Sequence, residues 1–117
     1  METGQTYVVE ITPEAEQYYQ DLLEHLYTTH SEESAFVKSE EILLMAISLE
    51  KMPNRGSDEP LLSYLEKGHK YLVYPVTSRK TVKIIYFVEE QTKKVFVTDF
   101  FPTEKNPAQL AERNRMQ

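Results

Sequence analysis

Apolar residues recur with helical spacing through the first half of the chain. Thr12, Pro13 and Glu14 predict a helix start, because they place a hydroxyl N-cap, a proline and a carboxylate at its first turn. The apolar residues that follow share one helix face: Ala15, Tyr18, Tyr19, Leu22, Leu23, Leu26 and Tyr27. Ser31 supplies a second N-cap, and a second apolar stripe extends to about Lys51. The short connection predicts that the two helices are antiparallel neighbours.

The second half of the chain changes to the two-residue period of β-strands. Residues 71–76 and 82–88 predict a hairpin around a turn at 77–80, and residues 94–101 predict a further strand. Residues 6–11 indicate a short strand from their β-branched and aromatic content. The order β-α-α-β-β-β predicts an α+β fold, with a helical hairpin packed on one face of a small antiparallel sheet.

Length and composition predict a single domain over residues 1–117. We expect a short terminal helix that begins near residue 107 and frayed ends at 1–5 and 112–117. The chain has no cysteine, which excludes disulfides, thiolate metal sites and cysteine nucleophiles. It has no signal-peptide pattern and no apolar run near the roughly 20 residues that span a membrane. We therefore expect a cytoplasmic protein without a membrane partner.

Charge is divided unevenly along the chain, whose net charge is -6. Residues 1–50 contain eleven acidic residues and a single cation, Lys38, whereas residues 51–117 contain eight acidic residues and twelve cations. This asymmetry predicts a bipolar surface. The acidic half is expected to be a solvated layer, and the basic half could bind an anion.

Cations near the predicted hairpin are candidates for such an anion site. Lys83 lies among apolar residues in the middle of a strand. There it either stabilises phosphate charge or lies on an exposed sheet face that resists association, and both interpretations stay open. Lys70, Arg79 and Lys80 flank the same hairpin and could form a basic patch with Lys83, although cations in turns are usually only solvated.

Histidine and tyrosine residues extend this list of candidates. His69 has the intrinsic pKa range of a general acid or base, although a plain surface histidine is the favoured interpretation. Tyr71 and Tyr74 are placed to stack on a base, although core packing is the default for a chain with eight tyrosines. Arg55 either contacts a substrate or caps the second helix. The candidate catalytic residues are Lys83, Lys70 and His69, and the candidate substrate-binding residues are Arg55, Arg79, Lys80, Tyr71 and Tyr74. No metal or cofactor is expected, because the histidines lack metal-ligand spacing and no glycine-rich phosphate loop is present.

Four short motifs occur in a fixed order along the chain. Residues 12–15 read TPEA after the first strand, and residues 53–56 read PNRG after the helical hairpin. Residues 83–86 read KIIY, and residues 101–107 read FPTEKNP at the end. Together with the element order, they resemble the RelE/ParE superfamily, the toxins of type II toxin–antitoxin modules, also called plasmid stabilisation proteins. The resemblance covers about 100 residues and is carried by the order of the motifs.

The resemblance implies a growth-inhibiting toxin that a cognate antitoxin neutralises. RelE-like members cut mRNA in the ribosome without a metal, using basic residues and a terminal-strand acid on one sheet face, so an enzyme of this kind would be an endoribonuclease. ParE-like members inhibit DNA gyrase instead. A third possibility is a degenerate, non-toxic member that acts as an interaction module. An exposed edge strand could also pair two copies as a homodimer.

Departures from the family pattern favour the ParE-like alternative. Val82 and Lys83 stand where the family commonly has Tyr-Arg, and a lysine lacks the bidentate fork of arginine. Glu104 stands where an arginine is common, and no His or Tyr follows the last strand as a proton donor. With the terminal acid also taken as absent, we expect binding of a target such as DNA gyrase rather than cleavage of ribosome-bound mRNA.

Overall fold

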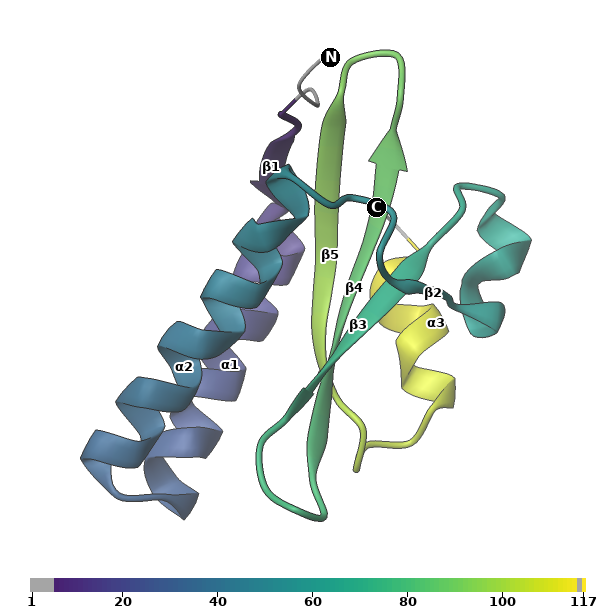
Figure 1. The fold of residues 1–117 in the computed structure, drawn as a ribbon. Coiled ribbons are helices and arrows are strands. Elements are labelled where there is room, and N and C mark those ends of the chain that lie inside the picture. Colours follow the sequence, from purple (N-terminus) through teal and green to yellow (C-terminus); the bar gives the residue numbers. More distant parts are fainter. Residues whose placement is uncertain (1–5, 116) are drawn as a thin grey trace.

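A five-stranded mixed sheet organises the described residues of the computed structural model, 6–115 and 117, into an α+β fold (Figure 1). In spatial order the strands are β1 (Val8–Ile11), β5 (Lys94–Pro102), β4 (Thr81–Glu89), β3 (Lys70–Pro75) and β2 (Ser57–Asp58). The pairs from β5 to β2 are antiparallel, whereas β1 runs parallel to β5. The predicted α+β class is confirmed.

The expectation of an all-antiparallel sheet is wrong at β1. A single helical hairpin returns the chain to the end of the sheet at which β1 began. The following meander therefore starts in the direction of β1, and its first and third strands, β3 and β5, share that direction. Because β1 pairs with β5 and not with a sequence neighbour, the pair is parallel.

Two long helices form the predicted antiparallel hairpin, α1 (Pro13–Thr29) and α2 (Glu32–Ile47). Both predicted N-caps are confirmed, because the hydroxyls of Thr12 and Ser31 accept the N–H groups of Ala15 and Ser34 at 3.1 Å. Figure 1 shows this hairpin on one face of the sheet, called the inner face from here on. The remaining helical elements are the 3₁₀ segments η1 (Ser48–Glu50) and η2 (Pro60–Leu65) and the helix α3 (Ala108–Asn114).

The opposite, outer face of the sheet is partly covered by η2 and α3 (Figure 1). Helix α3 continues to Asn114, beyond the expected onset of fraying at residue 112. The expected fraying of residues 1–5 lies outside the described residues. The sequence did not indicate η2, because a proline at its start is typical of a loop between secondary-structure elements.

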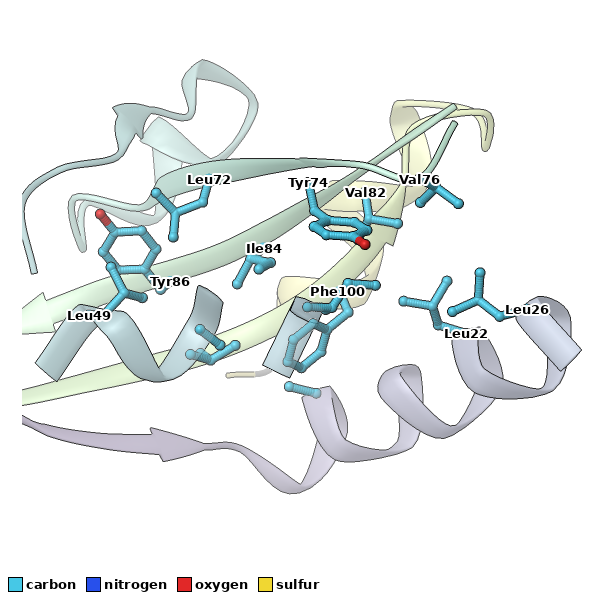
Figure 2. Close-up of a cluster of buried hydrophobic side chains, with 14 of the residues drawn as sticks. Leu22, Leu26, Leu49, Leu72, Tyr74, Val76, Val82, Ile84, Tyr86 and Phe100 are labelled. Carbon is cyan, nitrogen blue, oxygen red and sulfur yellow. The ribbon is translucent and has the colours of Figure 1, made fainter. Parts of the chain in front are cut away.

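The main core lies between the inner face and the helical hairpin (Figure 2). Strand β4 contributes to both faces by alternation: Val82, Ile84 and Tyr86 point inward, and Ile85 points outward. Tyr86 is fully buried, as predicted, and its hydroxyl accepts the N–H of Gly56 at 2.9 Å. A smaller outer cluster consists of Leu62, Ile85, Phe101 and Leu110.

One irregularity of the sheet positions residues on the outer face. Ile85 pairs with Asp99 while Tyr86 pairs with Val97, so Thr98 is an extra residue on β5. As a result, the side chains of Thr98 and Asp99 both contact α3, where Asn114 bonds to each of them. This β-bulge therefore fixes α3 against the sheet.

Candidate functional site

Lys83 lies on the outer face in the middle of β4, where it is paired with a buried acid. Its Nζ is 2.7 Å from Oε1 of Glu59 and 4.2 Å from the ring centroid of Tyr71. The Glu59 side chain is only 1% exposed, and its second oxygen accepts the N–H of Leu61 at 3.1 Å. The charge of Lys83 is therefore neutralised inside the protein by a carboxylate that also caps η2.

Strand register explains why these groups meet. Lys83 pairs with Val73 and Ile85 with Tyr71, so Tyr71 and Lys83 are diagonal neighbours on one face. The backbone N–H of Glu59 bonds to the carbonyl of His69 at 2.9 Å, which holds the acid beside β3. Two candidate residues, Lys83 and Tyr71, are thus brought together with an acid, Glu59, that the sequence did not single out.

His69 is buried, so the favoured interpretation of a plain surface histidine is wrong. It is 3% exposed, and its ring lies edge-on to Phe87 with the centroids 5.1 Å apart. Neither ring nitrogen has a hydrogen-bond partner among the described residues. Burial, reinforced by the nearby charge of Lys67, lowers the pKa of His69 to about 4. The ring is neutral at pH 7 and closed to solvent, which does not suit a general acid in this conformation.

Lys70 and Tyr74 do not join Lys83. Both alternate onto the inner face, where Lys70 forms an ion pair with Asp58 at 2.9 Å. Tyr74 belongs to the core, and its hydroxyl lies 2.5 Å from a carboxylate oxygen of Glu41. Burial and this carboxylate raise the pKa of Tyr74. Tyr74 therefore follows the default expectation of core packing, and the alternative role of stacking on a base is excluded for it.

The predicted basic patch is not assembled. Arg79 and Lys80 lie in the exposed turn between β3 and β4, and Lys80 is 3.7 Å from Glu104. Lys70 lies at the other end of β3, roughly 20 Å away along a six-residue strand. Arg55 is exposed in the loop after α2, and its guanidinium makes no hydrogen bond to the described residues. Arg55, Arg79 and Lys80 are exposed, so each of them fits the interpretation of a solvated cation.

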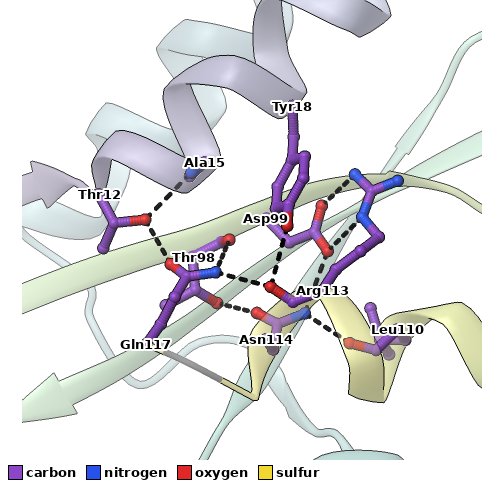
Figure 3. A network of polar contacts seen from close by, with 9 residues as sticks. All are labelled: Thr12, Ala15, Tyr18, Thr98, Asp99, Leu110, Arg113, Asn114 and Gln117. Carbon is purple, nitrogen blue, oxygen red and sulfur yellow. Dashed lines mark hydrogen bonds and ion pairs between the residues drawn. The ribbon is translucent and has the colours of Figure 1, made fainter.

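A second charged cluster on the outer face joins β5 to α3 (Figure 3). The guanidinium of Arg113 binds both oxygens of Asp99, at 2.6 and 3.0 Å, and Asn114 donates to the same carboxylate at 3.0 Å. The Asp99 side chain is fully buried, and the guanidinium carbon of Arg113 lies 4.0 Å from the ring centroid of Tyr18. Burial raises the pKa of Asp99, and the ion pair with Arg113 opposes that effect.

Asp99 corrects the assumption that the last strand has no acid. A carboxylate inside the apolar run 94–101 was the available signal, because such a group needs a buried partner. That partner, Arg113, lies 14 residues later and could not be identified from spacing. Beside Arg113, α1 and the segment after β5 enclose a hollow of about 160 Å³, lined by groups of both signs such as Asp21, Glu104 and Lys105.

The outer face therefore combines paired charges with aromatic rings. Phe87 stacks on Phe96 with the ring centroids 5.3 Å apart, and Val73 is 45% exposed beside Lys83. Such a surface suits contact with another macromolecule better than transfer of protons.

Comparison with known proteins does not identify a family for this chain. No family model, curated protein or solved structure matches the chain. Within residues 6–115 and 117, no group of three or more His, Cys, Asp or Glu residues could hold a metal ion. In that same part of the chain, no helix combines the length and apolar character needed to cross a bilayer.

Proposed function

We propose that this chain is the toxin of a type II toxin–antitoxin module and that it inhibits growth by binding a protein target such as DNA gyrase. The succession of β1, α1, α2, β3, β4 and β5 supports the RelE/ParE-like interpretation. So does a contact between two of its motifs, since Gly56 of PNRG donates its N–H to the hydroxyl of Tyr86 of KIIY. A Cβ at position 56 would lie 2.5 Å from that hydroxyl, which explains why a glycine stands there.

One observation supports target binding over RNA cleavage. Lys83 of β4 and Arg113 of α3, both on the outer side of the sheet, are each bound to a buried carboxylate. A cation that is neutralised in this way contributes little to the stabilisation of a phosphorane-like transition state, and His69 is buried and neutral. Partly exposed apolar and aromatic groups remain on this face as contact surface, namely Val73, Tyr71 and Phe87.

The test is expression of the chain alone in a bacterial host. We expect growth arrest with relaxed or broken plasmid DNA and with intact ribosome-bound mRNA. Val73→Glu places a charge at an exposed site on the outer face. It should relieve the arrest, because contact with the target would remove the new carboxylate from water at a cost in binding free energy. Leu44→Glu, at an exposed site on α2, is the matched control and should not relieve it.

Other outcomes select the alternatives. New 5′ ends within codons of ribosome-bound mRNA would replace target binding by RelE-like cleavage. Normal growth with soluble, folded protein would contradict toxicity and leave the degenerate interaction module.

A further inference from the structure

Helix α2 exposes large apolar side chains on the side that faces away from the core. They are 39–62% exposed and define what we call the α2 stripe: Phe36, Val37, Leu44 and Ile47. At about 100° per residue they fall within roughly 100° of arc, away from the buried Ala35, Ile42 and Ala46. An ordinary surface helix is apolar on one side only. Figure 1 shows no described segment of the chain over the side of α2 that faces away from the sheet.

The α2 stripe is surrounded by uncompensated negative charge. Glu33 and Glu40 fall within the same arc of the helix. Among the described residues, no carboxylate of α1 or α2 forms an ion pair with a Lys or Arg, whereas carboxylates elsewhere form seven. Lys38 does not compensate them, because its Nζ turns toward the sheet and donates to the carbonyl of Val76 at 2.8 Å.

One end of the α2 stripe carries a hollow suited to a cation. Tyr27 and Phe36, with Glu32 and Glu33, line an open depression of about 420 Å³ between the end of α1 and the start of α2. Two aromatic rings beside two carboxylates favour an arginine or lysine side chain, through cation–π contact and charge-assisted hydrogen bonds.

We propose that the α2 stripe docks a basic amphipathic helix from a different protein chain. The apolar residues of that helix would cover the stripe, its flanking Lys and Arg residues would face Glu33 and Glu40, and a terminal Arg would enter the hollow. From Phe36 to Ile47 the stripe is roughly 16 Å long, so a partner helix of about 12 residues covers it.

Charge complementarity selects this occupant over two others. A second copy in a symmetric dimer would place the same stripe against itself, so that one acidic surface would face another. An anionic membrane surface would repel the same carboxylates. The inference concerns a different face from the one assigned to target binding, so it does not depend on whether the chain arrests growth.

The probe is a synthetic 12-residue amphipathic helix with leucines on one face and arginines on the other. Titration into isotope-labelled protein should give saturable binding, with chemical-shift changes centred on Val37, Leu44 and Ile47. Leu44→Glu should weaken binding at least tenfold and Val73→Glu should not, and both substitutions lie at exposed sites. Affinity should also fall as salt rises, since screening acts on the charged flanks.

Four results would overturn the inference. They are no saturation at millimolar peptide, equal affinity for the peptide with every arginine replaced by glutamate, shift changes centred away from α2, and unchanged affinity in Leu44→Glu. Concentration-dependent dimerisation of the unbound protein, lost in Leu44→Glu, would assign the stripe to a second copy and would also reject the proposed partner.

Discussion

Removing Lys83 should destabilise the fold more than neutralising Glu59, although the two groups form one ion pair. Lys83→Ala leaves the carboxylate of Glu59, which is 1% exposed, without its cation and removes the contact with the Tyr71 ring. Glu59→Gln leaves an ammonium that is 24% exposed and can turn its charge toward water. The glutamine oxygen also retains the capping bond from the Leu61 N–H.

The magnitudes follow from this difference in burial. Breaking a buried pair at its exposed partner and stranding the buried one costs about 3–5 kcal/mol, so we expect that loss for Lys83→Ala. For Glu59→Gln we expect about 1–2 kcal/mol, close to the loss of one charge-assisted hydrogen bond. The double variant Lys83→Met with Glu59→Gln removes both charges and should be within about 2 kcal/mol of the wild type, because an apolar replacement of a buried pair is often neutral.

Urea denaturation followed by far-UV circular dichroism measures all three free energies of unfolding. With the single variant Lys83→Met added, the double-mutant cycle closes and gives the coupling between the two side chains, which we expect to be at least about 2 kcal/mol. A cost below about 1 kcal/mol for Lys83→Ala, as is usual for solvent-exposed pairs, would refute the assignment of a buried ion pair. Equal costs for the two single variants would refute the asymmetry.

Three further predictions concern other positions in the fold. The pKa of His69 is lowered to about 4 from an ordinary value of 6.5, so its neutral ring contributes stability above pH 6.5 that is lost as the pH falls toward 4. The full loss of free energy of unfolding is about 3 kcal/mol. Urea titrations at pH 7 and pH 4.5 should show most of this loss in the wild type and little of it in His69→Leu. Gly56→Ala should cost about 1–3 kcal/mol, because the new Cβ would lie 2.5 Å from the Tyr86 hydroxyl, and an unchanged urea midpoint would contradict that close approach. Arg113→Ala should cost about 3–5 kcal/mol by stranding the buried Asp99, and a melting temperature equal to that of the wild type would exclude the pair.

Local chemistry made much of the fold predictable. The helix starts depend on groups within four residues of each other, such as Thr12 with Ala15, and both were found from the sequence. Strand alternation likewise placed Tyr86 in the core. The parallel pairing of β1 with β5 was not predictable in this way, because it joins residues more than 80 positions apart and no local signal specifies the partner strand.

The candidate site was less predictable for the same reason. Lys83 was singled out correctly as unusual. Its partner Glu59 was not, because it lies 24 residues away in a segment whose sequence is typical of a loop. Asp99 meets Arg113 next to the extra residue Thr98, and spacing does not predict a β-bulge. The sequence pattern therefore identified unusual charged residues, but it did not identify the distant partners that neutralise them.

The ion pair of Lys83 changes how a growth experiment must be designed. Loss of arrest in Lys83→Ala would follow either from a missing contact with the target or from a destabilised fold, because the substitution strands Glu59. The double variant Lys83→Met with Glu59→Gln separates the two causes, since it removes the cation while retaining most of the stability. If the double variant is folded and still arrests growth, Lys83 serves the fold and the target contacts other residues, such as Val73. If it is folded and growth returns, the charge of Lys83 acts at the target interface despite its internal partner.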